Sequence, residues 1–518
     1  MKFLIKNLLI VIVILMVNSL FSCKNKDAQN MEPEISYYKE QYRNQYHFSP
    51  EANWMNDPNG MVYLDGEYHL FYQYYPDSTV WGPMHWAHSV SKDLIHWKHL
   101  PIALYPDSLG YIFSGSAVID HQNTAGFGKD ALVAIFTYHD IKGEQSGTSI
   151  TFQYQGIAYS LDKGRTFTKY EGNPVIPNPG IKDFRDPKVI WDEANNQWVL
   201  VLAAYDKAIF YVSPDLKSWR KTSEFGIDGD TRLWECPDLF PIKVKGTDEL
   251  KWVLITSIQK EGPNGGTATS YFIGEWDGER FVGDNSKQQW LDYGTDNYAA
   301  VSWSNAPSPD DEKLIIGWMS NWQYAQIVPS EKWRSAMTLP RVITLHNEGG
   351  EYQLRSKPVD KINSLIESTD SILPVVYRNH SELLDNLNGT SQINMKVEIL
   401  GDNVIEFKLS NALGEYTLVG YDPVLQHYFI DRSKSGTVDF FPDFPGMHTA
   451  QASYVKSEVD MTIFLDHASI ELFADDGRTV MTDIIFPTEP YNKLEIVTNN
   501  QEMKILKGSI SQLKSIWE

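Results

Sequence analysis

The sequence predicts an all-β protein with two domains, a five-bladed β-propeller followed by a C-terminal β-sandwich. Three observations support this prediction. Apolar residues almost never recur at helical spacing, and short alternating runs such as residues 68–72 (YHLFY) prevail instead, separated by turns such as Asp65-Gly66. Two series of recurring motifs divide the chain before residue 358 into units of similar length. After residue 360 this pattern stops, and tryptophan is absent until Trp517.

The first series consists of four aspartates that each lie between two strand-like runs. Three follow a serine two residues earlier, and all four precede an aromatic residue by four or five positions. They are Asp93, Asp162, Asp215 and Asp277, separated by 69, 53 and 62 residues. Because an aspartate at such a place favours a tight turn, each is predicted to form a hairpin turn in a repeating unit.

The second series marks where each unit begins. Strand-like segments open near Asp57, Ser114, Asp186, Cys236 and Tyr298, at spacings of 57, 72, 50 and 62 residues. Five units of about four strands each favour a five-bladed propeller over residues 37–358. An array of β-sandwiches is the alternative.

A second antiparallel β domain is predicted over residues 362–518. The repeating pattern ends near Lys357-Pro358. Beyond it, segments such as residues 392–400 (QINMKVEIL) alternate cleanly between apolar and polar side chains. Such alternation is typical of strands with one buried face, and a sandwich is the expected arrangement.

The N-terminus has the pattern of an export signal. Lys2 and Lys6 precede ten unbroken apolar residues, 8–17, a run too short for a membrane span. Residues 20–23 (LFSC) resemble a bacterial lipobox, which predicts a signal peptide over residues 1–22, a lipidated Cys23 and a polar tether over residues 23–36. We therefore expect an exported, membrane-anchored lipoprotein, periplasmic or at the cell surface. An ordinary cleaved signal with an incidental cysteine is the alternative.

Composition limits the partners. The formal net charge is −22, so an acidic surface would repel nucleic acid, and no nucleic-acid partner is expected. Contact with the membrane is expected only through the lipid at Cys23. The composition is compatible with a neutral substrate. Aromatic residues make up 13% of the chain.

Three motifs place carboxylates at the openings of predicted units. Asp57 lies in WMNDPNG, Asp186 in FRDP and Glu235 in WECPD. Taken singly, each is most simply a turn. In a propeller, however, the innermost strand of every blade starts at the central channel, so these residues should meet despite separations of 129 and 49 residues. Three carboxylates in an aromatic-lined pocket suit glycoside hydrolysis, with a nucleophile, an acid and a group that stabilises the oxocarbenium-like charge.

Together these motifs resemble glycoside hydrolase family 32, the invertases, inulinases and levanases. Supporting matches are WGPMHW from Trp81, FSGS from Phe113, GWMSNW from Gly317 and, in the second domain, DHASIELF from Asp466. The resemblance covers the chain from about Gln45 onward. It implies retaining hydrolysis of β-fructosides by a five-bladed propeller followed by a β-sandwich.

The resemblance also implies a role for individual residues. Asp57 would be the nucleophile, Glu235 the acid/base, and Asp186 the transition-state stabiliser. The positions that match sugar-contacting residues are Trp54, Asn56, Gln73, Trp81, Phe113, Ser114, Arg185 and Trp318. For Trp318 the alternative is a place in the propeller core, with Trp322 as a competing candidate. Cys236 is expected to be a small buried apolar residue.

The expected activity is release of fructose from fructans, levan or inulin, with exo action and with sucrose as a further substrate. An endo-levanase on the same scaffold is the first alternative, and a non-catalytic fructan-binding lipoprotein is the second. The linkage preference and the ratio of hydrolysis to fructosyl transfer stay open. No cofactor is expected. No metal site is expected either, because the clustered residues His85, His88, His96 and His99 straddle a strand-like segment and a turn.

Overall fold

The computed structural model describes residues 37–147, 149–378, 381–385, 387–452, 457–498 and 501–517. Cys23, the signal peptide and the tether predicted from the sequence lie outside these residues. Residues 41–518 form one compact unit. Within the described ranges no helix is both long and apolar enough to cross a membrane.

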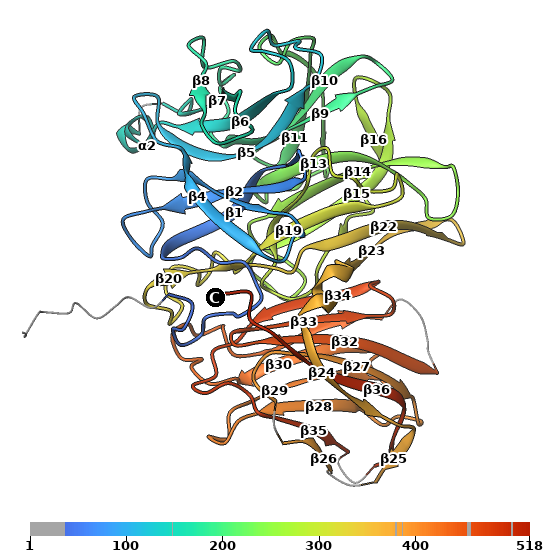
Figure 1. Ribbon diagram of the computed structural model, residues 1–518. Helices are drawn as coiled ribbons and strands as arrows, with labels where there is room; N and C mark the ends of the chain where they lie inside the picture. The colour runs from blue at the N-terminus through green and yellow to red at the C-terminus, as the bar shows by residue number, and fades with distance from the viewer. Residues whose placement is uncertain are drawn as a thin grey trace, which may run out of the picture. The chain divides into compact units, whose positions relative to one another are not determined.

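Five sheets make up the first part of this unit, and each has a core of antiparallel strands that are consecutive or nearly so along the chain (Figure 1). Blade 1 contains β1 (Asn53–Leu64), β2 (Glu67–Tyr75), β3 (His85–Ser91) and β4 (Trp97–Leu104), with β20 (Trp333–Arg334) parallel to β1. Blade 2 contains β5 (Tyr111–Asp120), β6 (Ala131–His139), β7 (Gln153–Ser160) and β8 (Thr168–Lys169), and the short helix α2 (Ile141–Ser146) joins β6 to β7.

The remaining three blades follow the same order. Blade 3 contains β9 (Phe184–Asp192), β10 (Gln197–Ala204), β11 (Lys207–Ser213) and β12 (Arg220–Gly226). Blade 4 contains β13 (Trp234–Lys243), β14 (Leu250–Ile258), β15 (Ala268–Trp276), β16 (Phe281–Gly283) and β17 (Gln289–Trp290). Blade 5 contains β18 (Tyr298–Ser302), β19 (Lys313–Met319), β21 (Ala336–Met337), β22 (Arg341–Glu348) and β23 (Glu351–Pro358).

The first strand of each blade faces the centre, and these five strands close into a ring. β1, β5, β9, β13 and β18 contact one another in that order, and β18 returns to β1. Two backbone hydrogen bonds fix the closure: Tyr63 N donates to Ser304 O over 2.9 Å, and Ser304 N donates to Met61 O over 3.0 Å. The predicted propeller is therefore confirmed, and its blades open where the second series of motifs placed them.

The repeated aspartates form the predicted hairpin turns. Each lies after the third strand of its blade, and its Oδ1 accepts hydrogen bonds from backbone N–H groups further along the turn. Asp215, for example, accepts from the N–H groups of Lys217 and Ser218 at 2.9 and 2.7 Å. A short carboxylate can satisfy these turn donors, which is why the same residue recurs in four blades.

Two further sheets follow the 3₁₀ helix η1 (Asp360–Leu365) and pack face to face around a second core, as predicted for a sandwich. The first contains β24 (Ile366–Ile372), β25 (Val375–Tyr377), β27 (Ser391–Glu398), β32 (Glu458–Asp466), β33 (Ser469–Ala474), β34 (Thr479–Ile484) and β36 (Met503–Leu513). The second contains β26 (Ser381–Leu384), β28 (Ile405–Ser410), β29 (Tyr416–Asp422), β30 (His427–Lys434), β31 (Met447–Gln451) and β35 (Lys493–Val497). On β27, alternate residues Ile393, Met395 and Val397 are buried, as the sequence pattern indicated.

A buried network of charged residues joins the propeller to the sandwich. Arg341 of β22 binds Asp292 at 2.9 Å and Glu471 of β33 at 2.6 Å. His47, in the segment before β1, lies between two carboxylates of the sandwich. Its Nδ1 is 2.8 Å from Asp466, and its Nε2 is 2.8 Å from Glu471. Charges buried this deeply must be paired, so the network ties both domains to the N-terminal segment.

We predict that this network makes stability fall as the pH rises above neutrality. Burial alone would lower the pKa of His47, but its hydrogen bonds to Asp466 and Glu471 raise that pKa to about 9. The unfolded value is about 6.5, so the stabilisation is complete below about pH 6.5 and is lost as the pH rises towards 9. The free energy of unfolding should fall by about 3 kcal/mol over this window. Thermal melts across these pH values measure the effect.

The matched variants are His47→Gln and His96→Gln. His96 is exposed and pairs with Asp93 on the surface, so its replacement should leave the pH dependence as in the parent. His47→Gln should lower the melting temperature at pH 6 and flatten the alkaline slope. The same alkaline slope in His47→Gln as in the parent would rule out His47 as its source.

Candidate active site

Each of the five innermost strands carries a β-bulge close to its first residue. The residues left out of the pairing register are Asn56-Asp57, Phe113-Ser114, Asp186-Pro187, Cys236-Pro237 and Ala299-Ala300. A bulge re-aims neighbouring side chains, and here it turns them into the channel. Pro187 and Pro237 fit because they lie within the bulges, outside the pairing register, where a missing N–H breaks no ladder hydrogen bond.

Backbone strain accompanies these bulges. Asp186 and Cys236 have φ values of 64° and 45°, in the left-handed region that residues other than glycine rarely adopt. Such strain persists only where the surrounding structure enforces it, and it concentrates at functional sites. The two bulges bring Asp186 and Cys236 together, because the Cys236 N–H donates to Asp186 Oδ2 over 3.0 Å.

Asp57 is buried, and two side chains donate to it. Ser114 Oγ donates to its Oδ2 over 2.7 Å, and Cys236 Sγ lies 3.3 Å from the same oxygen. Burial raises the pKa of Asp57, while the bonds from Ser114 and Cys236 oppose that rise. Its other oxygen, Oδ1, has no hydrogen-bond donor among the described residues. The carboxylate is thus fixed through Oδ2, whereas Oδ1 is buried and has no partner among the described residues.

Asp186 lies beside Asp57 and is also buried. Its backbone N–H donates to Thr137 Oγ1 over 2.9 Å, which anchors the strained residue to β6 of the neighbouring blade. Burial raises the pKa of Asp186 to about 7; Arg185 opposes this rise, and the charges of Glu235 and Asp57 add to it. Three carboxylates and one guanidinium in one pocket thus favour retention of a proton within the group.

Glu235 is held through both of its oxygens. Arg185 donates to Oε1 from Nε and Nη2, over 3.2 and 2.9 Å, and the Tyr298 hydroxyl donates to Oε2. Arg185 also donates from Nη1 to Asp183 over 2.7 Å. These bonds fix the direction of the Glu235 side chain from two neighbouring blades, so the carboxyl is pre-organised before any ligand arrives.

These groups line one pocket with a volume of about 260 Å³. It brings together the three predicted carboxylates and six of the eight predicted contact residues: Asn56, Gln73, Trp81, Phe113, Ser114 and Arg185. The pocket is also lined by Trp322, which the sequence offered as the alternative to Trp318, and by residues without a sequence signal: His139, Glu144, Gln153, Asp183, Gln259 and Gln326.

Trp54 and Trp318, the other two predicted contact residues, lie behind the pocket wall. Both are fully buried, and neither lines the cavity. Trp54 Nε1 donates to Asn56 Oδ1 over 2.7 Å, which fixes that amide. Trp318 is paired with Tyr298 in the blade, and its ring packs 4.9 Å from that of Trp322. Trp322 lies beyond the end of β19 and reaches the cavity, so it takes the place that we had predicted for Trp318.

The arrangement suits chemistry at a neutral, hydroxyl-rich molecule. One carboxylate has an unpaired oxygen, a second is oriented by an arginine and a tyrosine, and the third belongs to a residue with a strained backbone. Aromatic side chains form part of the wall. Such a set can attack a carbon centre, donate a proton to a departing oxygen and stabilise positive charge.

Comparison with known protein families identifies the scaffold. The model of the glycosyl hydrolases family 32 N-terminal domain matches residues 47–358, and that of the family 32 C-terminal domain matches residues 356–514. The chain belongs to glycosyl hydrolase family 32.

Relatives within family 32 match over most of their length. A levanase of Bacillus subtilis is 48% identical over 497 residues, which cover 93% of this chain and 72% of the levanase. An extracellular exo-inulinase of Aspergillus niger is 38% identical. The match covers 93% of this chain and 96% of the exo-inulinase. The crystal structure of an exo-inulinase from Aspergillus awamori superposes with a TM-score of 0.85 at 34% identity, over 93% of this chain and all of that one.

Two further features of this family 32 site were not predicted as functional. The first is Tyr298, which donates to Glu235. Its place at the start of the fifth unit is the one sequence feature from which this contact could have been predicted. His139 had no sequence signal. Its ring stacks on Phe113 at a centroid distance of 4.2 Å and an angle of 5°, and its Nε2 is 3.1 Å from Glu144. The Phe113–His139 stack extends the aromatic wall towards α2.

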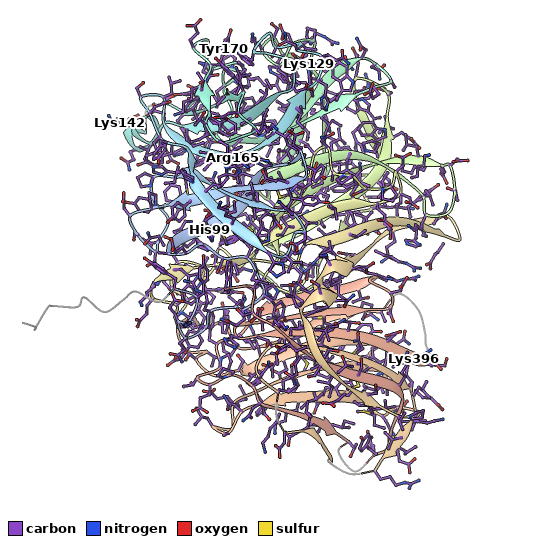
Figure 2. All side chains as sticks on the ribbon, viewed as in Figure 1. His99, Lys129, Lys142, Arg165, Tyr170 and Lys396 are labelled. Atoms are coloured by element: carbon purple, nitrogen blue, oxygen red, sulfur yellow. The ribbon has the colours of Figure 1, made fainter. Side chains whose placement is uncertain are left out.

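The clustered histidines of blade 1 serve separate structural contacts. His88 is hydrogen-bonded to His69, His99 to Ser89, and His96 to Asp93. Figure 2 labels His99, which lies on β4. In the part of the chain that the structure describes, no three histidine, cysteine, aspartate or glutamate side chains are grouped as a metal site would require.

Proposed function

We propose that this family 32 enzyme releases fructose from the ends of fructans, levan or inulin, and accepts sucrose in the same pocket. The main observation in support of this proposal is that Asp57, Asp186 and Glu235 line one cavity of about 260 Å³. The similarity to exo-inulinases supports action at chain ends. The similarity to a levanase and to exo-inulinases supports fructan as the substrate class.

In the proposed mechanism the Asp57 carboxylate attacks the anomeric carbon and forms a fructosyl ester. Glu235 protonates the oxygen of the departing sugar, and then takes a proton from the water that hydrolyses the ester, so the configuration is retained. Asp186 stabilises the positive charge that develops on the ring. Arg185 and Tyr298 hold Glu235 in place for both proton transfers.

The wall residues have distinct proposed tasks. Ser114 and Cys236 orient Asp57, while Asn56 and Gln73 offer amide groups to sugar hydroxyls. Trp81, Phe113 and Trp322 supply aromatic surface for the apolar faces of the sugar. Trp54 and Trp318 position residues that line the cavity: Trp54 donates to Asn56, and Trp318 packs against Trp322.

Product analysis tests this proposal. From the first minutes of digestion we expect fructose alone from levan and from inulin, because only the chain end reaches Asp57. Chromatography of timed samples distinguishes the alternatives. A ladder of oligosaccharides would show endo action, and new transfer products at high sucrose would show that sugars compete with water.

We also propose that the chain is exported and anchored by lipid at Cys23, followed by a tether to residue 36, a propeller domain over residues 37–358 and a sandwich domain over residues 362–518. The basic residues, the apolar run 8–17 and the LFSC motif support export and lipidation. The name of the extracellular exo-inulinase supports export.

We predict that Cys23→Ala moves the protein out of the detergent phase and leaves fructan hydrolysis unchanged. Two or more acyl chains give stable membrane anchoring, which this variant would lack. Phase partition and mass spectrometry of the mature N-terminus measure the effect. An unmodified N-terminus at a residue other than Cys23 would refute lipidation without affecting the proposed activity.

A further inference from the structure

A second cavity lies at the opposite end of the propeller strands from the catalytic pocket. The catalytic pocket is lined by residues near the starts of β5, β9 and β13, whereas Ile119, Trp191 and Pro241 from the far ends of the same strands line this second cavity. Its volume is about 340 Å³, against about 260 Å³ for the catalytic pocket. We call it the distal cavity.

The distal cavity is accessible to solutes and is separate from the catalytic carboxylates. Exposed residues line it, among them His121, Gln122 and Glu193, so it is in contact with solvent. Between the two pockets lies a void of only about 20 Å³, lined by Asp186 and Ser302. A sugar therefore cannot pass through the channel, and a ligand of the distal cavity must enter from the far side.

Three hydrogen-bond donors in the distal cavity have no acceptor within the described residues. Two are buried atoms, Trp191 Nε1 and Ser304 Oγ, and the third is the ammonium of Lys313, which lies 6.0 Å from the centroid of the Phe240 ring. Burial lowers the pKa of Lys313. An unsatisfied buried polar group costs about 1–3 kcal/mol, and such groups are rare in folded proteins. Two such groups beside one cavity, together with the ammonium of Lys313, favour a ligand that carries several acceptor oxygens.

Aromatic side chains form a large part of the remaining wall. Trp191, Trp198, Trp303 and Phe240 line the cavity, and the rings of Trp191 and Trp198 pack edge to face at 4.9 Å. Apolar walls with a few convergent polar groups are typical of small-molecule sites. The apolar C–H faces of a sugar ring pack well on such surfaces, and its hydroxyls can accept from the three donors.

The charges disfavour an anionic ligand. Lys188 also lines the cavity, but Asp238 lies 3.2 Å from its Nζ and neutralises it. Glu193 contributes a negative charge, which offsets that of Lys313. The whole chain carries a formal net charge of −22, so its field repels anions. A neutral molecule with many hydroxyls is not repelled by these negative charges.

We propose that the distal cavity is a second, non-catalytic carbohydrate-binding site that takes a fructose unit, free or at the end of a short fructan. The choice of fructose rests on the proposed function, while the choice of a carbohydrate rests on the donors and aromatic walls alone. The catalytic carboxylates do not line this cavity, so sugar bound there is held and not cleaved.

Calorimetric titration of the Asp57→Asn protein tests the proposal, since that variant leaves short substrates intact. Fructose and a fructose-terminated trisaccharide are the probes, with glucose as a second monosaccharide. We expect two sugars bound per chain. The double variant Trp191→Phe and Lys313→Met, on the same background, removes two donors at nearly constant shape and should bind one sugar per chain. Lys98→Met, which removes an exposed lysine on β4, should still bind two.

The outcomes are separable. One sugar per chain in Asp57→Asn, or two sugars in a correctly folded double variant, would overturn the proposal. Soaked crystals give an independent measurement: sugar density beside Trp191 supports the site, and ordered water alone contradicts it. If the wild-type enzyme releases no fructose from any substrate, the proposed function fails, while the glucose titration still tests the distal cavity as a carbohydrate site.

Discussion

Replacement of Asp57 by asparagine is expected to lower turnover of fructans and sucrose by about 10³-fold or more. The amide keeps the shape of the side chain and can still accept the hydrogen bond from Ser114, but it cannot form the fructosyl ester. The loss should therefore fall on kcat, with KM changed little. Initial rates of fructose release from sucrose and levan measure both quantities.

A matched control is Asp65→Asn in the turn at the other end of β1. Asp65 has a φ of 50°, which asparagine tolerates, and its only described ion pair is a surface contact with Lys163. This variant should keep full activity. If Asp57→Asn retained more than a tenth of wild-type activity with an unchanged melting temperature, the nucleophile would have to be another group, and a non-covalent mechanism would come into question.

Replacement of Glu235 by glutamine should produce a loss that depends on the leaving group. The side-chain oxygen of glutamine can still accept from Arg185, but glutamine has no acidic proton. Turnover of sucrose and levan should fall by about 10²- to 10⁴-fold, because their sugar leaving groups need protonation. A fructosyl fluoride, whose fluoride leaves unaided, should react to form the ester at nearly the wild-type rate in a single turnover.

Azide separates this role from a purely structural one. A small anion can attack the ester without a general base, so azide should accelerate the second step of Glu235→Gln and yield fructosyl azide. Equal losses on sucrose and on the fluoride, with no effect of azide, would mean that Glu235 only shapes the pocket. In that case the acid would have to be sought among the other groups that line it, such as Asp183 or Glu144.

The sequence was sufficient for the main features of the fold because the relevant signals are local. Asp93, Asp162, Asp215 and Asp277 each form a turn with residues that follow them directly. The fifth blade has no such aspartate, and its last hairpin turns at Gly349-Gly350 between β22 and β23. That blade was predicted from its opening at Tyr298 alone.

The carboxylates were predictable for a related reason. Each of the three carboxylates lies in a short motif with a proline (Pro58, Pro187 and Pro237), and all the openings meet at the ring of innermost strands. What the sequence does not reveal is the direction of a side chain within such an opening. Trp318 and Trp322 are four residues apart in one motif, and only the pairing of Trp318 with Tyr298 decides that Trp318 is buried and Trp322 reaches the pocket.

The buried ion pairs between the two domains could not be predicted from the sequence. His47 and Asp466 are 419 residues apart, and no motif in the sequence connects the two positions. The same holds for Arg341 and Glu471, whose ion pair depends on how the sandwich packs on the fifth blade. Such pairs depend on how the two folded domains pack against each other. The periodicity of the sequence carries no information about that packing.

The most direct test of the central claim is to identify the residue that carries the covalent intermediate. In Glu235→Gln treated with fructosyl fluoride, Asp57 should form the ester as fluoride departs, and hydrolysis should be slow because the base is missing. Peptide mapping by mass spectrometry of the quenched protein is expected to find one hexose on the peptide that contains Asp57. A hexose on another residue, or consumption of the fluoride with no adduct at any time, would contradict the proposed mechanism.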